Sequence, residues 1–88
     1  MSKLIDFESV CKDMTELYKK KNADYGDSFG KSYEEFGLTA PIIRLSDKLS
    51  RLKQLNSSGQ HQVKDESIQD TLTDLAAYAI MTIVELKK

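Results

Sequence analysis

The chain has 88 residues, of which 40% are hydrophobic and 31% are charged, and this composition fits one small globular domain over residues 1–88 with a limited core. Its 13 basic and 14 acidic residues leave a net charge of -1, which gives no strong sign of nucleic-acid or anionic-membrane binding. With a single cysteine, no secretory signal and no apolar run of roughly 20 residues, we expect a cytoplasmic protein without a membrane span.

The first predicted element is a helix over residues 4–21. Its apolar residues recur at the three-and-four spacing of one helical face: Phe7, Val10, Cys11, Met14, Leu17 and Tyr18. Three consecutive lysines end this helix at Lys21, where the helix dipole favours cations. Because Cys11 lies among apolar residues, we interpret it as a small core residue rather than a nucleophile.

A turn and a short helix are expected next. The turn is predicted by residues that are common in turns: Asn22, Asp24, Gly26 and Asp27. The short helix is predicted by aromatic residues at helical spacing: Phe29, Tyr33 and Phe36. Asp27 or Ser28 is expected to cap this helix, and Gly37 to end it. The aromatic residues form either a wedge in the core or a stacking site for a base.

A second long helix is predicted over residues 40–55, with Thr39 as its cap and Pro41 in its first turn, where a helix tolerates proline. Its apolar seam consists of Ile42, Leu45, Leu49, Leu52 and Leu55. A separate basic stripe consists of Arg44, Lys48 and Arg51, with Asp47 beside it. Residues 56–64 lack periodicity and are expected to form an exposed loop that contains His61, the only histidine.

The last predicted helix covers residues 65–88 and begins with Asp65 as its cap. Glu66, Asp70 and Asp74 are four residues apart, so they form one acidic stripe. The second half of this helix is apolar nearly all round, which is typical of a helix buried on most sides. Its main apolar face consists of Ile68, Leu72, Leu75, Ala76, Ala79, Ile80, Ile83 and Leu86. Because so short a chain can hardly cover this helix alone, we expect a homo-oligomer.

The pattern as a whole predicts an all-α fold, a small bundle of three long helices and one short helix. Within it, the acidic stripe should meet cations, because carboxylates at this spacing repel one another. In one interpretation the basic stripe pairs with it across an antiparallel helix hairpin. In the other, the acids bind Mg²⁺, a hard cation that prefers oxygen ligands, and the basic stripe binds phosphates. The two interpretations are compatible.

Three segments of the chain resemble the nucleotide modification associated domain 1 family, a group of small bacterial and phage proteins. They are Tyr-Gly-Asp-Ser-Phe at residues 25–29, Arg-Leu-Ser-Asp-Lys-Leu-Ser-Arg-Leu at 44–52, and Asp-Glu-Ser-Ile-Gln-Asp-Thr-Leu-Thr-Asp-Leu-Ala-Ala-Tyr-Ala at 65–79. This resemblance covers nearly the whole chain and implies a nucleotide context. The arrangement of acids on two helices is also similar to MazG-type all-α nucleoside triphosphate pyrophosphohydrolases, which are Mg²⁺-dependent helical oligomers.

These resemblances imply, as a first hypothesis, Mg²⁺-dependent hydrolysis of a nucleoside triphosphate to a monophosphate and pyrophosphate. The expected catalytic residues are Asp70 and Asp74, and the expected metal ligands are Asp47, Glu66, Asp70 and Asp74. Phosphates are expected on Arg44, Lys48, Arg51 and Lys31, and the base on Tyr25 or Phe29. The alternatives are a non-catalytic nucleotide-binding or sequestering module, and a structural oligomer or adaptor whose charged stripes only pair with each other.

Overall fold

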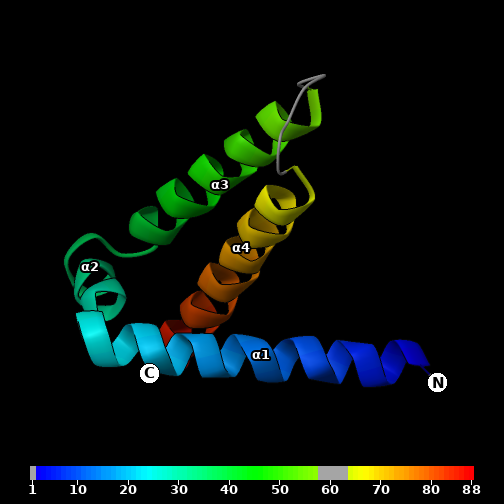
Figure 1. Cartoon of the computed structure of the whole chain (residues 1–88). Helices are drawn as coiled ribbons and strands as arrows, with labels where there is room; N and C mark the ends of the chain where they lie inside the picture. The colour runs from blue at the N-terminus through cyan, green and yellow to red at the C-terminus, as the bar shows by residue number, and fades with distance from the viewer. Residues whose placement is uncertain (1, 58–63) are drawn as a thin grey trace.

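The computed structural model describes residues 2–57 and 64–88, with the backbone alone for Tyr25 and residues 64–67. The helices are α1 (Ser2–Tyr25), α2 (Ser28–Phe36), α3 (Thr39–Ser57) and α4 (Lys64–Leu86). The described residues thus confirm the predicted all-α fold of three long helices and one short one. α3 and α4 lie side by side as an antiparallel hairpin, α1 crosses the end of α4 and projects beyond it, and α2 joins α1 to α3 (Figure 1).

α1 is longer than predicted. It continues through Asn22 and Asp24, because isolated turn-forming residues cost a helix well under about 1 kcal/mol each. The helix stops only at Gly26, whose φ of 70° lies in the left-handed region and whose N–H donates to the carbonyl of Asn22 at 2.8 Å. The predicted turn is therefore confined to Gly26 and Asp27, and Lys21 lies a full turn inside the helix.

The boundaries of the other helices follow the predicted caps closely. Asp27 caps α2, and its Oδ1 accepts a hydrogen bond from the N–H of Gly30 at 3.1 Å. Gly37 ends α2 with a φ of 66° and donates to the carbonyl of Tyr33 at 2.7 Å. α4 begins at Lys64, one residue before the predicted cap. Of the predicted loop over residues 56–64, both ends are helical, and residues 58–63, with His61, lie outside the described residues.

The hairpin of α3 and α4 is the best-packed part of the chain. Thr71 of α4 is 2% exposed, and its Oγ1 accepts a hydrogen bond from Nε of Arg51 on α3 at 3.3 Å. Thr82 is also buried, and its hydroxyl donates to the carbonyl of Tyr78 at 2.7 Å. Both threonines therefore keep hydrogen-bond partners in the interior, which removes most of the cost of burying them.

Little apolar surface is buried within a single chain. Among the described residues, Phe29 is the one large hydrophobic side chain in the buried class, at 5% exposure. The apolar faces predicted for the first and last helices are mostly exposed, as shown by Phe7, Val10, Leu17, Tyr18, Leu72, Ile80, Ile83 and Leu86. The interpretation of Cys11 as a core residue is wrong for the single chain, because the thiol is exposed and lines open cavities between α1 and α4. Among the described helices, none combines the length and apolar character needed to cross a membrane.

Candidate functional site

A cavity of about 200 Å³ lies where the C-terminal half of α1, the start of α2, α3 and α4 come together. We refer to it as the cationic–aromatic pocket, after six of its lining residues: Tyr18, Lys21, Phe29, Arg44, Asp74 and Tyr78. The unexpected last turn of α1 and the glycine turn after it position two sides of the pocket. Residues from all four helices therefore meet at one place, although they are spread over most of the chain.

Arg44 forms one wall of this pocket together with two aromatic rings. Its guanidinium carbon lies 5.3 Å from the ring centroid of Phe29 and 5.6 Å from that of Tyr78. The two rings are stacked, with centroids 6.0 Å apart and planes 12° from parallel. These distances are within the range of cation–π attraction. In the described part of the chain Arg44 makes no ion pair with a carboxylate, so its N–H groups are not committed to an internal anion.

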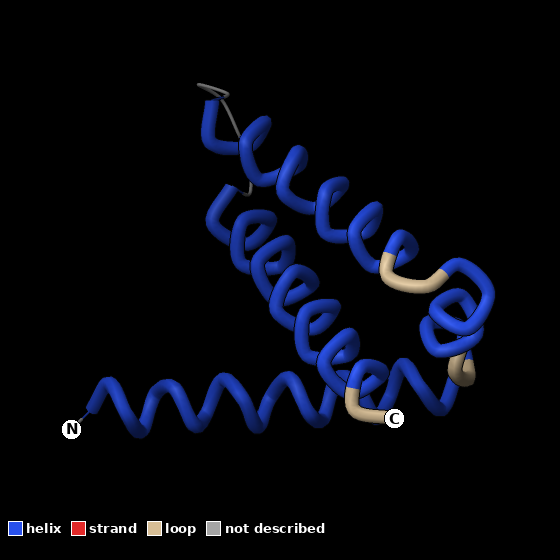
Figure 2. Tube along the Cα trace, turned by 180° about the vertical axis from the view of Figure 1, so that it is seen from behind, coloured by secondary structure: helices blue, strands red, loops and turns tan. Residues whose placement is uncertain are grey.

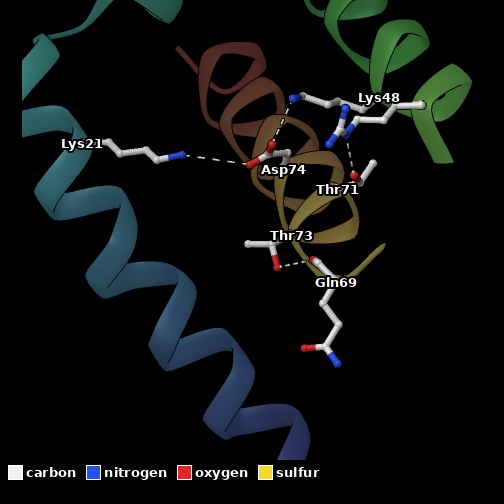
Figure 3. A network of polar contacts seen from close by, with 7 residues as sticks. Lys21, Lys48, Gln69, Thr71, Thr73 and Asp74 are labelled. Atoms are coloured by element: carbon white, nitrogen blue, oxygen red, sulfur yellow. Dashed lines mark hydrogen bonds and ion pairs between the residues drawn. The ribbon is translucent and has the colours of Figure 1, made fainter. Parts of the chain in front are cut away.

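Asp74 lies between two lysines at the edge of the pocket, one from each side (Figure 3). Lys48 on α3 approaches its Oδ2 to 3.0 Å, and both side chains are about 30% exposed, at 29% and 31%. Lys21 on α1 approaches Oδ1 to 4.0 Å and is 57% exposed, so this second contact is long and solvated. The predicted pairing of the basic and acidic stripes is thus confirmed for Lys48 and Asp74.

The other members of the two stripes have different surroundings. Arg51 donates to the hydroxyl of Thr71 and does not line the pocket, whereas Arg44 lies over aromatic rings. Asp70 is exposed and makes no ion pair with the described side chains, those of residues 2–24, 26–57 and 68–88. The stripe pattern therefore predicts the facing helices correctly but not the partner of each charge.

The predicted magnesium ligands are Asp47, Glu66, Asp70 and Asp74, and the structure describes three of their side chains. Asp47 and Asp70 are exposed, and Asp74 contacts lysines; the side chain of Glu66 is not described. The described residues contain no group of three His, Cys, Asp or Glu side chains that could hold a metal ion. A site that includes Glu66 stays a prediction.

The predicted base and phosphate ligands are also only partly brought together. Phe29 is buried against Tyr78 and Arg44, as expected for a wedge in the core. Lys31 is exposed on α2 and does not line the pocket. Of Tyr25, only the backbone is described.

Two pocket residues, Tyr18 and Lys21, were absent from the predicted site. They are three residues apart and lie on one face of α1. Sequence reasoning assigned Lys21 to the end of a helix that in fact continues for another turn, and so it missed this face. The signal in the sequence is Gly26, which ends the helix. A predicted helix that ran to Gly26 would have placed both residues beside the aromatic segment.

Residues 21–86, which are most of the chain, match the family described as nucleotide modification associated domain 1. The matched segment includes five of the six residues that define the pocket and begins at Lys21. Neither the curated proteins nor the solved structures contain a match to the chain. The similarity to MazG-type enzymes stays a prediction. The chain belongs to the nucleotide modification associated domain 1 family.

Proposed function

We propose that this member of the nucleotide modification associated domain 1 family binds a nucleotide in the cationic–aromatic pocket. The observation that carries the proposal is the position of Arg44. Its half-buried guanidinium lies over the rings of Phe29 and Tyr78 and has no carboxylate partner among the described residues. A partly desolvated arginine is normally paired with an anion. Its planar fork of donors suits a phosphate group, which would supply that anion.

The lysines beside Asp74 strengthen this site for an anion. Arg44 and Lys21 line the pocket, and Lys48 contacts the pocket residue Asp74 from outside the lining. These three positive charges stand against the carboxylates of Asp74 and Asp27. A phosphate group carries roughly 1.5 to 2 negative charges and can compete with a single carboxylate for these lysines. Lys21 can turn toward a phosphate at small cost, because its contact with Asp74 is long and solvated.

The size of the cavity indicates which part of a nucleotide it holds. Its volume of about 200 Å³ is below the roughly 300 to 1,000 Å³ of most small-molecule sites, so it fits a phosphate group and not a whole nucleotide. A neighbouring cavity of about 380 Å³ shares Tyr18, Phe29 and Met81 with it and has a largely apolar lining. We assign the base to this second cavity, where the half-exposed ring of Tyr18 offers a stacking surface.

The direct test is calorimetric titration with nucleoside mono-, di- and triphosphates carrying ordinary and modified bases, with and without Mg²⁺. We expect at least one nucleotide to bind, and we expect Arg44→Gln to weaken that binding at least about tenfold, because a charge-assisted hydrogen bond contributes roughly 1.5 to 3 kcal/mol. Lys53→Gln is the matched control. Lys53 is exposed on the same helix and outside the pocket, and its replacement removes the same charge.

Two results would contradict the proposal. One is the absence of binding across the nucleotide panel, and the other is equal affinity of the Arg44→Gln and Lys53→Gln variants. Release of pyrophosphate is measured in the same samples. Turnover that requires Mg²⁺ would add hydrolysis to binding, whereas binding without turnover would identify a sequestering or sensing module.

A further inference from the structure

The N-terminal half of α1 has an apolar face that the single chain leaves uncovered. It projects past the hairpin of α3 and α4 in both views of the backbone (Figures 1 and 2). Leu4 and Phe7 on this segment are 59% and 70% exposed. The apolar residues on this face alternate three and four positions apart, as they do at the contact positions of paired helices: Leu4, Phe7, Cys11, Met14 and Tyr18.

A groove of about 560 Å³ lies between this face and α4. We refer to it as the α1–α4 groove, and its uncharged lining residues are Phe7, Val10, Cys11, Met14, Ala76 and Ile80. The remaining lining residues are Lys3 and Asp6, one charge of each sign. The groove therefore suits an apolar helix with mixed charges at its margin, and it does not select a strongly acidic or basic partner.

The exposed area of the chain indicates how large the missing contact is. The chain exposes 7037 Å², whereas a compact monomer of its mass exposes about 5,200 Å², which leaves an excess of about 1,800 Å². A standard interface buries about 800 Å² on each partner, and obligate homodimers bury more. The radius of gyration, 14.6 Å against about 12 Å for a compact chain of this length, agrees with this excess.

We propose that the α1–α4 groove receives α1 of a second copy of the chain, in a two-fold dimer in which each copy contributes both a groove and a helix. Two-fold contacts require a surface that complements itself, and here one helix carries both a wall of the groove and the apolar face that would fill a groove. The margin of the groove carries Lys3 and Asp6, one charge of each sign, so the margins of two copies also complement each other. The excess area has the size that such a dimer buries. This inference does not rest on nucleotide binding, although the groove shares Cys11, Met14 and Ile80 with the cavity that we assign to the base.

Sedimentation equilibrium of the full chain tests the proposal. We expect a mass of about 20 kDa, twice the 10.0 kDa of one chain. Phe7→Glu should reduce it to the mass of one chain, because the dimer would bury a charge in the apolar groove. Ile43→Glu is the matched control: Ile43 is 55% exposed on α3 and outside the groove, so this variant should stay dimeric.

The thiol of Cys11 supplies a second measurement that needs no substitution. It is exposed in the single chain and lines the groove, so a second copy should cover it. We expect alkylation of Cys11 in the unmodified protein to be much slower than alkylation of a peptide of residues 7–15. A monomeric wild-type protein, a loss of the dimer in Ile43→Glu but not in Phe7→Glu, or a thiol as reactive as that of the peptide would each overturn the proposal.

Discussion

The hairpin of α3 and α4 and the long helix α1 differ in how many contacts they make within the single chain. The hairpin of α3 and α4 finds partners within the chain: Thr71 is buried with a hydrogen bond from Arg51, and Lys48 contacts Asp74 at 3.0 Å. α1 has few such partners: within the described residues, its one ion pair to another helix is the 4.0 Å contact of Lys21 with Asp74. The same helical periodicity thus marks a face that the chain covers and a face that it leaves open.

This difference separates two roles along α1. Its C-terminal half lines the cationic–aromatic pocket and joins the hairpin there, through Tyr18 and Lys21. Its N-terminal half carries apolar residues that stay exposed in the single chain, and it precedes the segment that matches the family. We infer that the site depends on how firmly α1 and α2 are held against the hairpin, and substitutions at the junction test this.

The largest effect is expected at Phe29, which fastens α2 to the hairpin. Phe29→Ala removes the one large hydrophobic side chain in the buried class among the described residues and should destabilise the protein by about 3 to 5 kcal/mol. Phe36→Ala is the control, since Phe36 is on the same helix and 61% exposed, and it should cost less than about 1 kcal/mol. Urea unfolding measures both. Similar losses in the two variants would show that α2 is not anchored through Phe29.

The sequence predicted the fold well because its signals are local. Helical periodicity, the cap at Asp27 and the stop at Gly37 need no knowledge of distant residues, and each of them is found in the structure. That the basic and acidic stripes face each other was also predictable, because they lie on an antiparallel hairpin, and Lys48 with Asp74 is a pair that forms between them.

The misplaced residues depend on tertiary contacts. Arg44 lies over two rings that are distant from each other in the sequence, and periodicity cannot show which of several neighbours an arginine selects. Cys11 was assigned to the core because an apolar face does not reveal whether its cover comes from the same chain or from a second one. Most of the helices were therefore predictable, whereas the pocket was predictable only in part.

At Asp74 we expect a smaller change in stability, together with a change in nucleotide affinity whose direction tests the proposed site. Asp74→Asn should cost about 1 kcal/mol, between the values for exposed and buried ion pairs. In the proposed site this carboxylate competes with phosphate for the lysines, so its loss should tighten nucleotide binding. If Asp74 instead serves in hydrolysis, as the sequence-based hypothesis holds, the same variant should lose pyrophosphate release.

Asp70→Asn separates these outcomes from a general effect of charge. Asp70 is exposed, lies one turn before Asp74 and does not line the pocket, so we expect its replacement to leave nucleotide affinity and stability nearly unchanged. Calorimetric titration and urea unfolding of the two variants give the comparison. Weaker binding in Asp74→Asn would contradict the competition that we propose.

The smallest effect on stability should come from the two lysines that contact Asp74. Lys48→Gln removes a half-buried contact of 3.0 Å within the hairpin and should cost up to about 1 kcal/mol. Lys21→Gln removes a contact of 4.0 Å from an exposed side chain of α1 and should leave stability unchanged. In the proposed site each lysine helps to hold the phosphate, so nucleotide binding should weaken in both variants. If Lys21→Gln binds as tightly as wild type, α1 does not contribute its charge to the site, and the charges that hold the phosphate come from the hairpin alone.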